Sequence, residues 1–404
     1  MELDLSPEQE MLREAVRGVC EQHAPLSVVR SLEDDPVGYP EKLWSQLAAL
    51  DLCGLVLPDE LGGAGTSLLD AAVVYEELGR ALAPSPHFVS CVMSAGAIRR
   101  AGTGKQHEAW LASIARGEAI VTPAWLEPDR GFGPRGVALR AEAADGAGKG
   151  GWRLTGVKRH VVFARAADRL LVLARTGDQA GDVEMFLVAP DADGVTLVEQ
   201  QTLASETQYR VEIAGVAVRD EDRLGSGGAT GGRAGSPGSP GSPWEAWEAA
   251  MLDGVVLLAA QAAGGAAHAL DITVEYAKTR HQFDKPLGAF QAIAHYLADA
   301  ATRVDGARTL VYEAAWAASE GRSIERLAPM AKLFACETFR DVTAMGQQVF
   351  GGVGFTVDYD IQLYFRRAKQ LQLSWWDTRE LEERIAATVL DAPVGAGASG
   401  AAGR

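Results

Sequence analysis

Three patterns of hydrophobic and polar positions follow one another along the chain. From Ser6 to about residue 120, and again from Trp244 to about Leu390, apolar residues recur with the spacing of one face of an α-helix. Between about Val121 and Gly225, short runs of alternating apolar residues stand between clusters of Gly and Asp. Such runs are typical of antiparallel strands in a barrel or sandwich. The pattern therefore predicts a helical part, a β part and a second helical part.

We divide the chain accordingly, as an α+β multidomain protein. An N-terminal helical domain is expected over 1–120, a middle antiparallel β-barrel-like domain over 121–225 and a C-terminal antiparallel four-helix bundle over 244–392. Residues 226–243 repeat Gly, Ser and Pro, a composition that predicts a linker. Residues 393–404 are small and polar, and we expect them to form a disordered tail.

Individual elements can be predicted within these parts. Ser6 followed by Pro7 indicates an N-cap with proline at the first helical position. Strands are expected at 136–140, 152–154, 170–174, 183–188 and 211–213. Long helices are expected at 244–280, 290–320, 323–350 and 378–390.

Composition narrows the functional classes. The 404 residues are 47% hydrophobic and 23% charged, which is typical of a globular protein. A formal net charge of -16 argues against a nucleic-acid partner, because phosphate binding needs clustered Lys and Arg. The four cysteines show neither metal-ligand spacing nor a disulfide pattern. With no signal peptide and no long apolar run, we expect a cytoplasmic protein without a membrane partner.

The stretch YAKTRHQFDKPLGAFQ, Tyr276 to Gln291, joins two predicted helices through a turn. Arg280 lies near the end of the first helix, and Gln291 lies at the start of the second. An arginine fork beside a helix N-terminus can bind an anion such as a pyrophosphate. Arg280 can equally serve only to end its helix, where a cation is favourable. Spacing alone leaves both interpretations open.

Two sequence blocks carry a resemblance to a known family. Y-A-x-x-R-x-x-F with P-L-x-x-F-Q, and then QQVFGGVGF from Gln347 to Phe355, resemble signature segments of the acyl-CoA dehydrogenase family. Shorter matches lie at 55–58, 60–65 and 76–80. The resemblance implies that fold, FAD as cofactor and a homo- or hetero-tetramer. It also implies six residues that hold the FAD of a neighbouring subunit: Arg280, Phe283, Gln291, Gln348, Gly351 and Gly352.

The resemblance further implies oxidation of an acyl thioester at Cα and Cβ. In the family, a carboxylate removes the α proton while a hydride passes to the flavin. Matching the family's usual glutamate to this sequence gives Trp375, and matching its other known location gives Gly254. Neither residue can accept a proton. Asp377 and Asp253 lie close by in sequence.

The two nearby aspartates have competing interpretations. Asp253 is offset by one helical residue from the family's position, which rotates its side chain by about 100° and points it elsewhere. Asp377 precedes a predicted helix and can cap it, or can act as the base after a local backbone shift.

The positions that face the flavin ring in the family also differ. Leu126 replaces the threonine of a T-E-P segment, while His160 and Val162 replace the tryptophan and threonine of a W-I-T-N segment. His160 can stack on a ring or be a structural residue. Asp284 replaces a glycine and adds negative charge near the predicted pyrophosphate site.

Three functions are consistent with this pattern. The chain can be an active dehydrogenase that uses Asp377 or another base. It can instead be a non-catalytic subunit that completes the FAD site of a partner carrying the base. A third interpretation is a non-redox enzyme on the same fold, in which Trp375 and Trp376 line a pocket for a bulky ligand.

Overall fold

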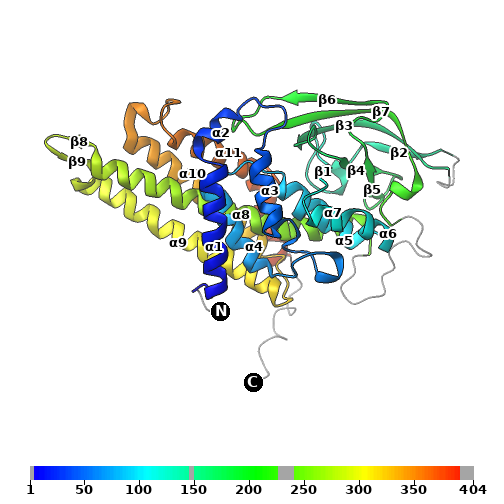
Figure 1. Ribbon diagram of the computed structural model, residues 1–404, viewed down its shortest axis with the longest axis horizontal. Helices are drawn as coiled ribbons and strands as arrows, with labels where there is room; N and C mark the ends of the chain where they lie inside the picture. The colour runs from blue at the N-terminus through cyan, green and yellow to red at the C-terminus, as the bar shows by residue number, and fades with distance from the viewer. Residues whose placement is uncertain (1–3, 145–149, 226–240, 392–404) are drawn as a thin grey trace, which may run out of the picture.

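The computed structural model describes residues 4–144, 150–225 and 241–391. Most of the predicted linker and all of the predicted tail lie outside the described residues. Figure 1 shows a β-sheet on one side of the molecule and long helices that extend away from it on the other. Helical, β and helical segments follow in the predicted order. The domain boundaries themselves stay a prediction.

Short helices make up the N-terminal part, and their first N-cap is the predicted one. The Ser6 hydroxyl accepts from the Gln9 amide at 3.2 Å, and the Gln9 side chain accepts from the Ser6 amide at 3.0 Å. The helices are α1 (Pro7–His23), α2 (Leu26–Ser31), α3 (Glu41–Ala49), α4 (Leu68–Arg80), a π-helical turn (Phe88–Ser94), α5 (Ala95–Ala101), α6 (Gly104–Gln106), a second π-helical turn (His107–Leu111) and α7 (Ala112–Ala115).

The middle part is a mixed sheet rather than a purely antiparallel one. Its described strands are β1 (Val121–Ala124), β2 (Arg140–Ala143), β3 (Trp152–Val162), β4 (Arg169–Arg175), β5 (Val183–Val188), β6 (Val195–Gln200) and β7 (Gln208–Val218). They lie in the order β1-β4-β2-β3-β7-β6, with β5 also on β4. β4 runs parallel to β1 and also pairs in parallel with the first residue of β2, while the other pairs are antiparallel.

The strand predictions were partly wrong. β1 was missed because all its residues are buried, so it lacks the alternation that marks a half-exposed strand. β6 was missed as well. The strand predicted over 136–140 begins only at Arg140, since Pro134–Gly136 forms a helical turn.

The C-terminal part contains five described helices rather than four. They are α8 (Pro243–Thr279), α9 (Gln291–Ser319), α10 (Leu327–Phe350), α11 (Ile361–Leu373) and α12 (Thr378–Val389). A small hairpin of β8 (His281–Gln282) and β9 (Lys285–Pro286) joins α8 to α9. The sequence pattern missed α11 because its buried positions include Gln362, Arg367 and Gln370, which read as polar.

Helix α8 is the central element of the fold. It is long and apolar enough to span a membrane, but 78% of its most apolar window is buried inside the protein. Helix α4 crosses α8 so closely that the two helix backbones pack directly against each other. A Cβ on Gly264 would lie 1.8 Å from the Glu76 carbonyl oxygen, and one on Gly79 would lie 2.0 Å from that of Gln261. This close approach requires glycine on both helices.

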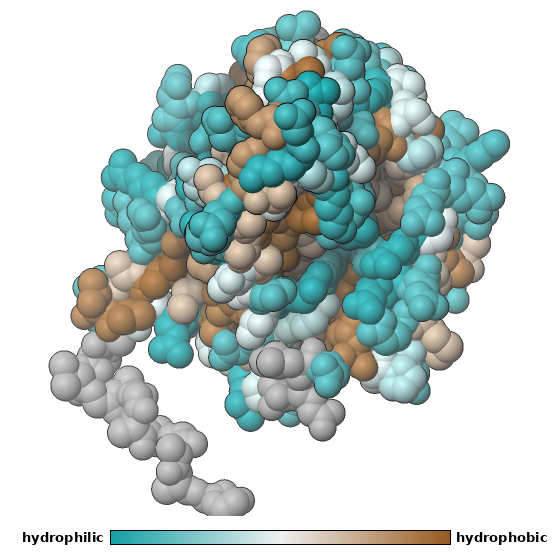
Figure 2. All heavy atoms as spheres, turned by 90° about the vertical axis from the view of Figure 1, so that its left-hand side faces the viewer, coloured by the Kyte–Doolittle hydropathy of each residue, from teal (hydrophilic) through white to brown (hydrophobic). Residues whose placement is uncertain are grey.

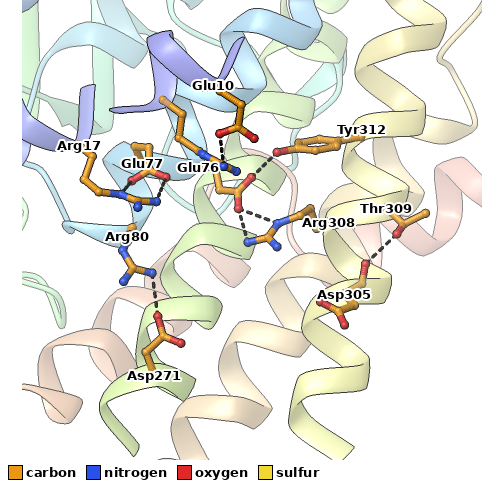
Figure 3. Close-up of polar contacts among 11 residues, drawn as sticks. Glu10, Arg17, Glu76, Glu77, Arg80, Asp271, Asp305, Arg308, Thr309 and Tyr312 are labelled. Carbon is orange, nitrogen blue, oxygen red and sulfur yellow. Dashed lines mark hydrogen bonds and ion pairs between the residues drawn. The ribbon is translucent and has the colours of Figure 1, made fainter. Parts of the chain in front are cut away.

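Ion pairs connect α4 to its neighbours, as Figure 3 shows. Glu76 accepts from Arg308 Nε at 2.7 Å and from the Tyr312 hydroxyl at 2.6 Å, both on α9. Glu77 accepts two hydrogen bonds from Arg17 of α1, at 2.9 and 2.7 Å. The segment 76–80, matched to the family by sequence, therefore serves to assemble helices.

Candidate functional site

A cavity of about 310 Å³ opens between the sheet and α11. Its walls come from the segment after β1, from β3 and β7, and from the end of α11 with the loop that follows. The lining residues are Trp125, Leu126, His160, Val162, Gln201, Thr202, Leu203, Gln208, Gln370, Leu373, Ser374 and Trp375. Neither Asp nor Glu occurs among these described lining residues, so the cavity wall offers no carboxylate base.

The three positions predicted to face a flavin ring meet in this cavity. Leu126 and Val162 present apolar side chains to it. His160 Nδ1 lies 3.0 Å from Gln208 Oε1, and burial lowers the pKa of the imidazole, which is therefore mainly neutral at pH 7. The backbone places His160 in the left-handed region, with φ 54°. Their role toward a flavin stays a prediction.

Trp375, the residue matched by sequence to the family's base, closes one side of the cavity with aromatic rings. Its ring stacks on Trp125, with centroids 5.7 Å apart and planes at 23°. It also meets Phe88 edge-on at 5.0 Å. Trp375 and Trp376 both have left-handed backbone, with φ 53° and 72°. This conformation turns the Trp375 ring toward the sheet instead of continuing α11.

A buried lysine holds the loop of Trp375 in place. The Nζ of Lys332 donates to the carbonyl oxygens of Ser374 at 2.9 Å, Trp376 at 2.8 Å and Leu371 at 3.1 Å. Burial lowers the pKa of this ammonium group. All three donors of the ammonium group are thus used on the backbone that positions Trp375.

Gly254 is the other residue matched by sequence to a family base, and a side chain there would meet Met93 and Phe88 as they are placed in this structure. A Cβ there would lie 2.6 Å from the Met93 sulfur and 3.3 Å from the Phe88 ring. Neighbouring Asp253 forms an ion pair with Arg100 at 2.5 Å, so its side chain points elsewhere, as expected from the helical offset.

Asp377 is the N-cap of α12. Its Oδ1 accepts from the Glu380 amide at 2.9 Å, which confirms the capping interpretation. It is not among the residues that line the cavity. Its role as a base stays a prediction that this geometry does not support.

A buried ion pair beneath Leu126 was missed by sequence reasoning. Lys158 Nζ lies 2.7 Å from Glu127 Oε1, and that oxygen also accepts from the amides of Ala138 and Leu139 at 2.9 Å. Burial lowers the pKa of Lys158 to about 8, although Glu127 acts in the opposite direction. The pair fixes the segment that carries Leu126 and Trp125.

The predicted FAD-holding residues lie elsewhere, at the tip of the long helices. Arg280 caps α8 through its backbone, with its amide 2.8 Å from the Tyr276 carbonyl oxygen. Its exposed side chain has no polar partner among the described residues. Tyr276 stacks on Phe350 at 4.1 Å, which brings the two signature blocks together. Figure 1 places the hairpin after Arg280 far from the sheet.

The other predicted donors surround this tip. Gln291 begins α9, Gln348 lies in the last turn of α10, and Gly351 and Gly352 follow directly, all exposed. Gly351 has φ 69°, and a Cβ at either glycine would meet no atom within 4 Å. Phe283 is 86% exposed, and Figure 2, which looks onto this end, shows apolar side chains among polar ones.

Comparisons with known proteins identify the family. Residues 6–118 match the model for the acyl-CoA dehydrogenase N-terminal domain, and residues 244–374 match the model for the C-terminal domain. The acyl-CoA dehydrogenase IpdE2 of Mycolicibacterium smegmatis is 31% identical over 388 residues, which span 95% of this chain and all of that protein. The chain belongs to the acyl-CoA dehydrogenase family.

Solved structures confirm the acyl-CoA dehydrogenase fold. The ChsE4-ChsE5 complex of Mycobacterium tuberculosis contains a chain with TM-score 0.84 and 27% identity, covering 97% of this chain and 100% of that one. A variant of the Tcur3481-Tcur3483 steroid ACAD has TM-score 0.80 and 31% identity, covering 95% and 98%. As an acyl-CoA dehydrogenase-type oxidoreductase, the protein takes part in flavoprotein oxidation of acyl-CoA, with FAD as cofactor.

Proposed function

We propose that this chain contributes to acyl-CoA dehydrogenase activity as the complementing subunit of a heteromeric assembly. It completes the FAD site of a partner subunit, and the partner supplies the carboxylate that removes the α proton. The observation that carries the proposal is the contrast between the two ends of the molecule. Trp375 and Gly254, the residues matched by sequence to the family's base, carry no carboxylate, and the wall of the 310 Å³ cavity holds none either, whereas the predicted donors at the helix tips are present and exposed.

The residues at the tip fit the part of FAD that they would hold. A free guanidinium at Arg280 suits a pyrophosphate, because the planar fork binds phosphate oxygens in pairs. Open space beside Gly351 and Gly352 lets a ligand approach the backbone. When bound, FAD supplies the hydride acceptor of the reaction.

This chain's own cavity fits a flavin ring less well. The side chains of Leu126 and Val162 offer no hydrogen-bond donor to a ring edge. Two solved relatives are described by paired names, ChsE4-ChsE5 and Tcur3481-Tcur3483, which supports a two-component assembly for this chain too.

We further propose a cytoplasmic heterotetramer as the form of that assembly. Exposed apolar side chains at the helix tips, Phe283, Phe355 and Val357 among them, support a subunit interface there. All four cysteines are buried free thiols, which fits a reducing compartment.

FAD content and redox activity of the isolated and co-expressed chains test the proposal. Purified alone, the chain should carry little FAD, and an acyl-CoA should not bleach its visible absorbance anaerobically. Co-expressed with a dehydrogenase subunit that retains the glutamate base, it should form a yellow complex that bleaches. A stable homotetramer with full FAD occupancy that bleaches with an acyl-CoA would overturn the proposal.

A variant of Arg280 at the tip of the long helices tests whether this chain holds the FAD of a partner subunit. Arg280→Met should lower the FAD content of the mixed complex at least about tenfold, since a charge-assisted pair of hydrogen bonds is lost. Arg322→Met, beyond the other end of α9, serves as the control and should leave the FAD content of the mixed complex unchanged. Equal FAD content in both variants would contradict the assignment of Arg280.

A further inference from the structure

Arg367 of α11 is a buried cation without a partner among the described residues. Only 7% of its surface is exposed, and its enclosed Nε makes no hydrogen bond. Its side chain forms no ion pair either. The preceding Arg366, in contrast, pairs with Glu33 and donates to the Ser205 hydroxyl at 3.0 Å. A buried guanidinium is costly unless an anion or other acceptor replaces its lost water.

Gln370 adds an unpartnered acceptor three residues further along α11. It is 9% exposed, and its Nε2 donates to the carboxylate of Glu206. Because an ionised carboxylate only accepts, this contact fixes the orientation of the amide. Its Oε1 is enclosed and has no hydrogen-bond partner. Helix α11 therefore presents an unused donor and an unused acceptor on neighbouring positions of one face.

Both side chains line a small cavity of about 40 Å³. Gln370, Trp375 and Val162 also line the 310 Å³ cavity, so the small one forms its narrow inner end. Phe88 and Leu258 give this inner end apolar walls. A ligand that extends from the larger cavity past these shared side chains would meet Arg367.

We propose that this inner end binds the carboxylate of a small hydroxy acid. The carboxylate pairs with the guanidinium of Arg367, whose fork matches two oxygens. The hydroxyl donates to Gln370 Oε1, and the hydrocarbon part lies against Val162 and Trp375. The inference does not depend on which subunit carries the redox reaction, because it rests on groups of this chain alone.

The charge of Glu206 provides a second test of carboxylate binding at Arg367. It lines the same cavity and is held by the amides of Gln370 and Gln208, the latter at 3.2 Å. Its negative charge opposes that of a bound carboxylate. Removing that charge should therefore strengthen binding, whereas removing the charge of Arg367 should weaken it.

Calorimetric titration with matched probes tests the ligand class, and quenching of tryptophan fluorescence follows the same binding at Trp375. Sodium 3-hydroxybutyrate is the probe, butyrate lacks its hydroxyl, and 3-hydroxybutyramide lacks its charge. We expect butyrate to bind about threefold more weakly and the amide at least about tenfold more weakly. No saturable binding of 3-hydroxybutyrate up to about 50 mM would overturn the proposal.

Variants then locate the site. Arg367→Met should weaken 3-hydroxybutyrate at least about tenfold, Gln370→Leu should reduce it to the level of butyrate, and Glu206→Gln should strengthen it severalfold. Arg379→Met, whose side chain is exposed and pairs with Glu383, is the control and should bind as the unmodified protein does.

Folding of the main variant is checked by its melting temperature. Arg367→Met should melt at or above the temperature of the unmodified protein, because an unpaired buried charge is removed. Unchanged affinity in a folded Arg367→Met, or weaker binding by Glu206→Gln, would overturn the assignment.

Discussion

At the scale of single residues, the site is shaped by charges in apolar surroundings. Lys158 and Lys332 are both fully buried, and each uses its ammonium group to fix a segment of the cavity wall. Lys158 holds the segment of Trp125 and Leu126 through Glu127, while Lys332 holds the loop of Trp375. The two tryptophans that stack on one side of the cavity thus each lie on a segment that a buried lysine fixes.

The buried Lys158 should make stability depend on pH above neutrality. Its folded pKa is lowered to about 8 by burial, whereas an unfolded lysine titrates near 10.4. Between these values the unfolded chain binds more protons, so the free energy of unfolding should rise with pH, by up to about 3 kcal/mol. Urea denaturation from pH 8 to 10.5 measures this rise, which Lys158→Met should lack.

A second lysine variant separates this effect from general alkaline behaviour. Lys42→Met replaces an exposed lysine of α3 and should keep the pH dependence of the unmodified protein. Parallel curves for the unmodified protein and Lys158→Met would contradict the prediction.

Short motifs gave three positions predicted to face a flavin ring, but not what surrounds those positions. Leu126, His160 and Val162 were found by matching short motifs, and they do line one cavity. The partners Lys158, Lys332 and Arg367 carry no motif. Their importance comes from burial, and burial depends on contacts between distant segments that no local spacing reveals.

At the scale of elements, the long apolar helices were predicted within a few residues. Helix α8 was expected over 244–280 and spans Pro243–Thr279. Two elements were missed where burial does not follow the apolar pattern, because β1 is buried on both faces and α11 buries polar side chains. Helix α11 lines the cavity and β1 leads directly into the lining segment of Trp125 and Leu126, so the site was the part of the fold least visible in the sequence.

The hairpin between α8 and α9 carries strain that a substitution should relieve. Phe283 and Asp284 both have left-handed backbone, with φ 52° and 62°, in a two-residue turn between β8 and β9. Asp284→Gly should stabilise the hairpin by about 0.5–1 kcal/mol and remove a negative charge near Arg280. Amide hydrogen exchange over 281–286 and FAD retention in the mixed complex are the measurements.

Asp284→Asn distinguishes the two effects. It removes the charge but keeps a side chain, so it should raise FAD retention without slowing amide exchange as much as glycine does. If Asp284→Gly leaves both exchange and retention unchanged, the turn is neither strained nor close to the bound phosphate.

At the scale of the whole molecule, buried ion pairs tie the N-terminal helices to the long helices. Glu76 is 5% exposed and depends on Arg308 and Tyr312 of α9. Arg308→Met should lower the free energy of unfolding by about 3 kcal/mol, because a buried carboxylate loses its cation. Urea denaturation measures the loss, with Arg322→Met as an exposed control.

The double variant Glu76→Gln with Arg308→Met checks the cause of that loss. Removing both charges should recover part of the stability, since no unpaired carboxylate remains. A double variant as unstable as the sum of the two single variants would indicate independent effects.

The separation between the helix tips and the cavity has a genetic consequence. Under the proposed division of roles, an allele that damages Arg280 and an allele that removes the partner's base would abolish the same activity from different genes. An allele altering Trp375 would leave that activity largely intact. Epistasis between the two genes would therefore depend on residues at the helix tips of this chain and not on residues of its cavity. A growth screen could identify the functional surface of this chain without any purified protein.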